Sequence, residues 1–225
     1  MPLPERLRKK LAERAKEPAQ EPKAVPQHLS EVERILRLPR RPSPSSDVLA
    51  LYRAEIESML SVGSKESCSC ESRFHRTCCS TLMDNQAWAL EELRHNMGLV
   101  GSIGVGHGKT LLDLLAPMVV PCRVALLLVP PNLQKQLAED IKFYSGHWKL
   151  PNIVGSQWFY PGRPVLHVVA YTKLSGAKST DLLGEIRPDF IILDEAHCVA
   201  DTSSVRGSRF ARYMRQNPGT KLACW

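Results

Sequence analysis

The glycine-rich segment GSIGVGHGKTLLDLL, residues 101 to 115, constrains the fold of this chain more than any other stretch. Glycine takes backbone angles that let a loop wrap its N–H groups around an anion, and a following helix points the positive end of its dipole at the same place. Lys109 would then reach the β- and γ-phosphates of a nucleotide, and Thr110 would offer its hydroxyl to Mg²⁺. The full pattern has a glycine where this chain has Ile103, and a glycine-rich hairpin before an amphipathic helix is the alternative. The segment predicts a phosphate-binding loop made of Gly104, Val105, Gly106, His107, Gly108, Lys109 and Thr110.

A second stretch, FIILDEAHCVAD, supports this interpretation. Its four apolar residues, 190 to 193, are typical of a buried parallel strand, and the acidic pair Asp194 and Glu195 follows at the carboxyl end. Open α/β sheets bind their ligands at that end. Asp194 can hold Mg²⁺ through water, and Glu195 can orient and polarise an attacking water. The two motifs in this order predict an ATP hydrolase with ATP and Mg²⁺ as ligands.

These motifs also carry a family resemblance. The letters of residues 194 to 197 resemble the DEAH-type motif II of superfamily 2 helicases and translocases, and GVGHGKT resembles motif I of that family. LLLVPPNLQKQLAED (126 to 140) resembles motif Ia, and VVAYTKLS (168 to 175) resembles the segment around motif Ib. The resemblance covers roughly residues 80 to 225 and implies a P-loop, RecA-like lobe, the first of two. The second lobe, which would follow a motif III after KLACW, is expected to be missing from this chain.

The resemblance further implies functional roles. Lys109, Asp194, Glu195 and His197 form the expected catalytic set, in which His197 couples nucleotide state to strand binding across the lobe cleft. The expected nucleic-acid contacts are Pro130, Asn132, Tyr171 and Thr172. Double-stranded DNA is the favoured track, because the GHGKT loop and the YTKLS segment resemble Swi/Snf-type and phage-type DNA translocases more than RNA helicases.

Gln86 precedes the phosphate loop at the distance where helicase families place a glutamine that reads the adenine edge. Its side-chain amide can pair in two directions with adenine N6 and N7. The alternative is an exposed glutamine on a helix, and Trp88 beside it is interpreted as core packing.

Strands alternating with helices predict an α/β fold with a doubly wound parallel sheet. After a first strand at Leu99, the expected strands are residues 123–129, 165–170, 189–193 and 221–225. The expected helices are residues 109–118, 132–144 and 205–216, with a short helical stretch ending at Ile186. Residues 145 to 164 are expected to be irregular.

Three regions are expected along the chain. Residues 1–45 are expected to form a basic, proline-rich and partly disordered tail. Residues 46–80 are expected to contain a helix capped by Asp47 and ended by Gly63, followed by a cysteine-rich segment. Residues 81–225 are expected to form the ATP-binding lobe, incomplete at its carboxyl end. A further helix is expected over residues 82–97.

The net charge of +7 is concentrated in the tail, where residues 1–45 hold 11 Lys and Arg against 6 Asp and Glu. A basic tail can add salt-sensitive attraction to nucleic acid, or it can be a solvated segment without a partner. The chain has no apolar run long enough to span a membrane and no secretory signal, so the sequence predicts a cytoplasmic protein without a membrane partner. The resemblance to phage-type translocases implies a bacterium or a phage-infected cell.

Seven cysteines without an export signal argue against a disulfide framework. Cys122, Cys198 and Cys224 are expected to be buried thiols. The segment 68 to 79 can instead hold one tetrahedral Zn²⁺, although C-x-C is a less usual spacing than C-x-x-C and reduced thiols in a loop are the alternative. The candidate Zn²⁺ ligands are Cys68, Cys70 and Cys78, with Cys79 or His75 as the fourth.

Aromatic residues gather in the irregular stretch between residues 145 and 164. They can stack on bases beside phosphates, or they can anchor the loop to its own domain. The residues concerned are Trp148, Trp158, Phe159 and Tyr160, with Lys149 and Arg163.

The leading functional hypothesis is an ATP-dependent helicase or translocase, represented by its first motor lobe. One alternative is a P-loop ATPase that acts on protein partners, whose turnover would be indifferent to DNA. The other is a Zn²⁺-binding adaptor with a nucleotide-fold scaffold, whose binding would survive the loss of Lys109.

Overall fold

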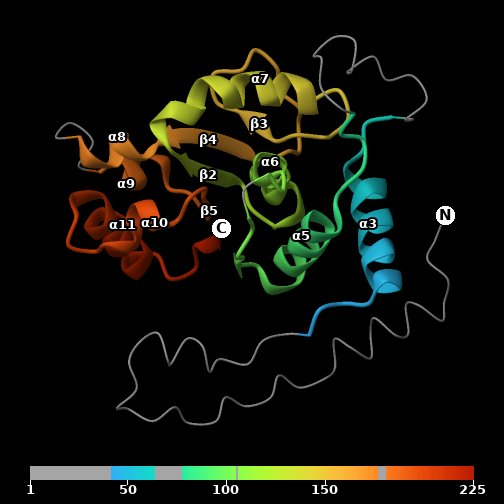
Figure 1. Cartoon of the computed structure of the whole chain (residues 1–225). Coiled ribbons are helices and arrows are strands. Elements are labelled where there is room, and N and C mark those ends of the chain that lie inside the picture. The colour runs from blue at the N-terminus through green and yellow to red at the C-terminus, as the bar shows by residue number, and fades with distance from the viewer. Residues whose placement is uncertain (1–41, 64–77, 105, 177–180) are drawn as a thin grey trace, which may run out of the picture. The chain divides into compact units, whose positions relative to one another are not determined.

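The structure is a computed structural model, and it describes residues 42–63, 78–104, 106–176 and 181–225 (Figure 1). The chain divides into two compact units, Met1–Pro44 and Ser45–Trp225. Apart from residues 42–44, the first unit lies outside the described residues, so the prediction for the basic tail falls there. Everything that follows concerns the second unit.

The second unit is built on one six-stranded sheet in which every strand pair is parallel. The strand order is β1-β6-β5-β2-β4-β3. The strands are β1 Leu99–Val100, β2 Val124–Val129, β3 Asn152–Ile153, β4 Val165–Ala170, β5 Phe190–Leu193 and β6 Lys221–Cys224. The prediction of an α/β fold with a parallel sheet is therefore confirmed. β3 lies within the stretch expected to be irregular, because a two-residue strand leaves no periodic signal in the sequence.

The central strands β2 and β5 are apolar and buried on both faces, as parallel strands covered by helices must be. Leu127 of β2 and Ile192 of β5 belong to one hydrophobic core, whereas Leu126 and Ile191 belong to a second core on the opposite face. The alternation follows from the two-residue period of a strand.

Helices cover both cores. The first is packed by α3 Ser46–Leu60, α5 Asp84–Asn96, α6 Lys109–Val119 and α7 Gln134–Tyr144, which continues the 3₁₀ turn η2 Pro131–Leu133. The second is packed by α8 Tyr171–Ser175, α9 Leu182–Ile186, α10 His197–Ala200 and α11 Val205–Gln216. The predicted elements of the lobe agree with these bounds to within about two residues.

Helix α3 belongs to the same compact unit as the sheet. It begins at Ser46 after Ser45 and ends at Leu60, so the predictions that Asp47 caps it and that Gly63 ends it are wrong. The Glu57 side chain accepts a hydrogen bond of 2.8 Å from the Leu82 N–H, just ahead of α5. This bond joins α3 to the segment that leads into α5.

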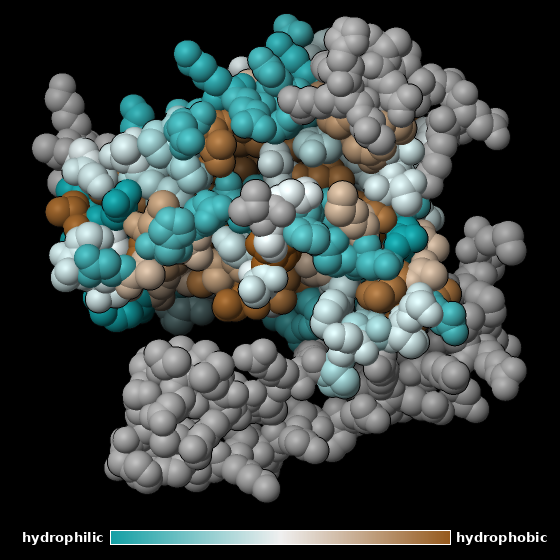
Figure 2. All heavy atoms as spheres, in the orientation of Figure 1, coloured by the Kyte–Doolittle hydropathy of each residue, from teal (hydrophilic) through white to brown (hydrophobic). Residues whose placement is uncertain are grey.

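Figure 2 shows hydrophilic side chains on the outer side of α7. Lys135 and Glu139 of this helix are exposed. Within the described residues, no helix is both long and apolar enough to cross a membrane.

Candidate active site

The glycine-rich loop lies between β1 and α6, as predicted. Two of its glycines take positive φ angles, 82° at Gly106 and 68° at Gly108, where residues with side chains are strained. Gly108 is the N-cap of α6, and Lys109 and Thr110 open the helix. Gly104 is different: it has no such angle, and it lies close to the His107 ring instead. The loop therefore leads directly into the amino end of an 11-residue helix, the arrangement that binds phosphate groups.

Val105 lies outside the described residues, and His107 is exposed. The prediction that their backbones help to cradle phosphates stays a prediction.

Gln86 is buried against this loop. Its Nε2 donates to the Gly108 carbonyl at 3.1 Å and lies 3.5 Å from the His107 carbonyl, while its Oε1 accepts from the Met83 N–H at 2.9 Å. Both ends of the amide are thus used within the chain, and the expected pairing with adenine would require these bonds to be exchanged. The alternative of an exposed helix glutamine is wrong, because only 3% of Gln86 is accessible.

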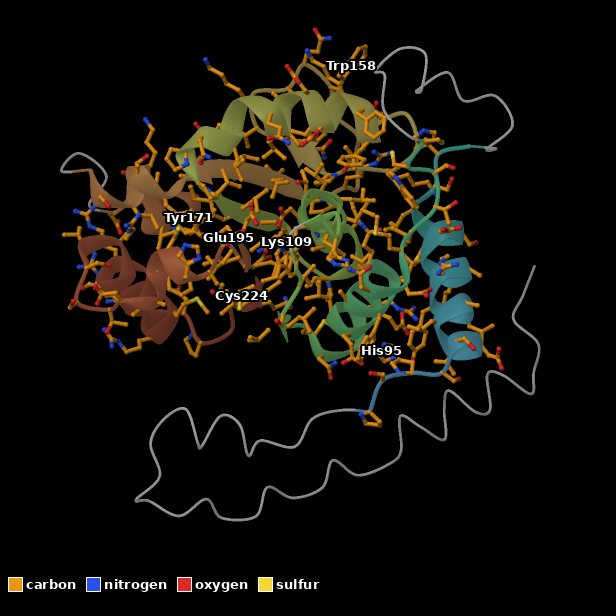
Figure 3. All side chains as sticks on the ribbon, in the orientation of Figure 1. His95, Lys109, Trp158, Tyr171, Glu195 and Cys224 are labelled. Carbon is orange, nitrogen blue, oxygen red and sulfur yellow. The ribbon has the colours of Figure 1, made fainter. Side chains whose placement is uncertain are left out.

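The acidic pair follows β5 at the carboxyl edge of the sheet. Asp194 is buried, whereas Glu195 is partly exposed and takes a left-handed backbone conformation with φ of 60°. Lys109 Nζ donates to Glu195 Oε1 at 2.7 Å, across 86 positions of sequence. Figure 3 shows Lys109 and Glu195 beside one another. The sheet therefore brings together the two motifs that the sequence singled out.

Asp194 and Glu195 lie in different surroundings, which shift their pKa values in opposite directions. The hydrogen bond from Lys109 lowers the pKa of Glu195, so this carboxylate stays charged. Burial raises the pKa of Asp194, and the nearby Lys109 ammonium offsets part of that rise. A buried acid beside a solvated one is the arrangement by which two neighbouring carboxylates take different tasks.

His197 begins α10, one residue after the acidic pair. Its side chain is 76% exposed, and Nδ1 lies 3.5 Å from Glu195 Oε2. The imidazole is therefore placed between the acidic pair and solvent. Its expected role in coupling nucleotide to strand binding stays a prediction.

Asp113 and Trp225 join this site, although the sequence analysis missed both. Asp113 lies one turn after Lys109 on α6, and its carboxylate accepts a hydrogen bond of 3.2 Å from Trp225 Nε1. Burial and the neighbouring Asp194 charge hold the pKa of Asp113 well above its usual range. A single acid inside the apolar run TLLDLLA was the signal that could have found it.

The expected nucleic-acid contacts lie where β2 and β4 end. Asn132 and Thr172 are exposed and Pro130 is partly buried. Tyr171 has no accessible surface, and its hydroxyl donates to the Asp194 carbonyl at 2.9 Å. The expectation that the Tyr171 side chain contacts nucleic acid is therefore wrong, because the ring packs in the second core and supports the turn of residues 194–196, the acidic turn.

The aromatic residues of the stretch 145–164 divide into two kinds. Trp148 is buried and donates to the Cys79 carbonyl at 2.8 Å, so it anchors the loop and cannot stack on bases. Trp158 and Phe159 are 65% and 70% exposed. They precede β4 and so lie near the amino edge of the sheet, and Figure 3 places Trp158 well away from Lys109.

Of the candidate Zn²⁺ ligands, Cys68, Cys70 and His75 lie outside the described residues. Cys78 Sγ lies 3.7 Å from Nε2 of His147, a buried histidine that the sequence analysis did not consider. The described residues contain no cluster of three metal-binding side chains.

The cysteines expected to be buried thiols are Cys122, Cys198 and Cys224. All three are free and partly buried, and burial raises the pKa of Cys122 to about 12.

Comparison with known proteins adds no relative: no family model matches the chain, and no match was found among curated proteins.

Proposed function

We propose that this chain is the first motor lobe of an ATP-dependent nucleic-acid helicase or translocase of the RecA-like, superfamily 2 kind, with double-stranded DNA as the favoured track. One observation carries the proposal: the Lys109 ammonium and the Glu195 carboxylate, from the two motifs, lie 2.7 Å apart at the carboxyl edge of a parallel sheet. Ligands of open α/β sheets bind at this edge.

The residues present fit ATP and Mg²⁺. The N–H groups of the loop that ends at Gly108, together with the amino end of α6, suit phosphate oxygens. Thr110 and Asp194 would hold Mg²⁺, and Glu195 would orient the attacking water. When bound, Mg²⁺ neutralises charge that develops on the phosphates.

Lys109 and Glu195 also constrain how a nucleotide enters. The Lys109 ammonium and the Glu195 carboxylate form an ion pair, so a phosphate that binds Lys109 must break this ion pair. The Glu195 carboxylate is then free to accept a hydrogen bond from water. One ion pair thus links occupation of the loop to release of the catalytic base.

Nucleotide affinity tests the proposal. We expect Lys109→Ala to weaken ATP·Mg²⁺ binding at least about tenfold, which is the smaller value for losing a charged hydrogen bond, with the melting temperature little changed. Lys142→Ala on the exposed side of α7 is the matched control. Equal affinity of a folded Lys109→Ala variant and the control would refute the phosphate-loop assignment.

The proposed preference for double-stranded DNA is tested separately, by measuring the binding of duplex DNA to the same chain. A helicase lobe binds it in a salt-dependent manner. If the chain binds ATP but does not bind duplex DNA, the alternative of an ATPase that acts on protein partners is favoured.

A Zn²⁺-binding segment is a second candidate function, favoured by the 3.7 Å contact between Cys78 and His147. Thiolate and imidazole are the ligands that structural Zn²⁺ sites use. The measurement is the zinc content of the purified chain, which Cys78→Ser should lower and Cys122→Ser should leave unchanged. Absence of bound zinc in the wild-type chain would refute this candidate.

A further inference from the structure

Asp113 is a carboxylate buried in the middle of an apolar helix. It is 2% exposed, and its neighbours on α6, Leu112 and Leu114, are fully buried. A buried carboxyl group in such surroundings is unfavourable unless it has a hydrogen-bond partner. The partner is the indole N–H of Trp225, at 3.2 Å and 112 positions along the chain. This bond ties α6, the helix of the phosphate loop, to the end of β6.

Trp225 is also bonded through its backbone. Its carbonyl oxygen accepts from the N–H of Glu195 at 3.1 Å and from the N–H of Ala196 at 3.4 Å. The residue itself is 8% exposed and packs in the first hydrophobic core. Trp225 therefore holds the acidic turn with its carbonyl while its side chain is held by α6.

The acidic turn needs such support, because the backbone of Glu195 is in the left-handed conformation, which is unfavourable for a residue other than glycine. A conformation of this kind persists where the surrounding structure holds it, and it is found most often at functional sites. Here it accompanies the contact between the Glu195 carboxylate and Lys109. The bonds of Trp225 are thus the means by which β6 places the expected catalytic base.

We propose that Asp113 and Trp225 are positioning residues for Glu195, an inference that rests on the proposed function. The Asp113–Trp225 bond fixes the end of β6, the Trp225 carbonyl fixes the two N–H groups after Asp194, and the Glu195 carboxylate is thereby held toward the phosphate loop. Neither residue needs to touch nucleotide for this role. Changing either should affect the use of bound ATP more than its binding.

Three substitutions separate this role from ordinary packing. Trp225→Phe keeps an aromatic ring and removes the donor, and Asp113→Leu fills the apolar site and removes the acceptor. Asp113→Asn keeps an amide oxygen that can accept the same bond. Trp88→Phe is the matched control, because it removes another indole–carboxylate bond, of 3.3 Å to Glu92 on α5, far from the acidic turn in sequence.

The first measurement is hydrogen exchange of the Glu195 and Ala196 amides in the intact chain. We expect Trp225→Phe and Asp113→Leu to speed exchange about twofold or more, the smaller value for losing one hydrogen bond between neutral groups. Asp113→Asn and Trp88→Phe should stay near the wild-type rate. Unchanged exchange in Trp225→Phe would overturn the inference.

The second measurement is single-turnover hydrolysis with the chain in excess over ATP, followed long enough to resolve the slow rate expected of the chain without a second lobe. The two disruptive variants should hydrolyse more slowly while their ATP affinity stays within about twofold of wild type, which no packing defect at the loop would produce. Loss of affinity in step with hydrolysis would overturn the positioning role. A wild-type chain that fails to bind ATP would refute the proposed function instead, and the exchange rates would still decide whether the pair holds the turn.

Discussion

Gly108→Ala should be the most damaging small substitution in the glycine-rich loop. Gly108 caps α6 at φ of 68°, and a methyl group built there would overlap the Gln86 Nε2 atom. Because Nε2 is the end of a flexible side chain, it can rotate away. It then gives up its bond to the Gly108 carbonyl, and the bond between Gln86 Oε1 and the Met83 N–H is weakened as well.

The magnitude follows from these two effects. A residue with a side chain in left-handed conformation costs about 1–2 kcal/mol. A buried amide left without its partner costs about 1–3 kcal/mol, and Gln86 is 3% exposed. We therefore expect Gly108→Ala to lower the free energy of unfolding by about 2–5 kcal/mol, a large part of the 5–15 kcal/mol typical of a folded domain.

Two other glycines provide the controls. Gly106 has a φ of 82° but open space around it, so Gly106→Ala should cost only the backbone term of about 1–2 kcal/mol. Gly219 has neither a positive φ nor a close neighbour, so Gly219→Ala should be neutral or stabilising by less than about 1 kcal/mol. Urea unfolding followed by circular dichroism gives all three values.

The double variant with Gln86→Ala completes the test. Removing the amide relieves the overlap, so the two substitutions together should cost less than the sum of their separate effects. Equal losses for Gly108→Ala and Gly106→Ala, or strict additivity with Gln86→Ala, would refute the reasoning.

Three further predictions follow from the site and the sheet. In a protein that includes a second lobe, Glu195→Gln should keep ATP bound and slow its hydrolysis on the order of 10²- to 10⁴-fold, because an amide cannot act as the base; a wild-type rate there would show that the acidic pair is structural. The isolated chain should release phosphate from ATP hardly at all and respond little to duplex DNA, because an arginine finger from a second lobe is worth roughly 10³- to 10⁵-fold; strong DNA-stimulated turnover would contradict the proposal that a second lobe supplies this arginine. Burial lowers the pKa of His167, so the imidazole of the unfolded chain takes up a proton more readily than that of the folded chain. The free energy of unfolding should therefore fall as pH drops through the ordinary histidine range near 6.5. His167→Gln should flatten this pH dependence in urea melts, and an equally steep pH dependence in the variant would contradict the prediction.

Much of the fold was predictable because its signals are local. The apolar runs that became β2 and β5, and the glycines at 106 and 108, act within a few residues of themselves. Strand order is not local: β6 lies between β1 and β5 because of pairings formed across the whole lobe. The contact between Lys109 and Glu195 was implied once both motifs were assigned to carboxyl ends of parallel strands.

The sequence by itself determined the α/β class, the approximate bounds of the elements and the positions of the glycine-rich loop and acidic pair, since periodicity and glycine content report local backbone geometry. Only the tertiary structure decided which polar groups meet. It turned Gln86 onto the loop, buried Tyr171 beneath the acidic turn, and joined Asp113 to Trp225 across 112 positions. The physical reason is that a buried polar group must find a hydrogen-bond partner, and that partner is supplied by whichever segment the sheet brings near, at a distance in sequence that no local pattern records.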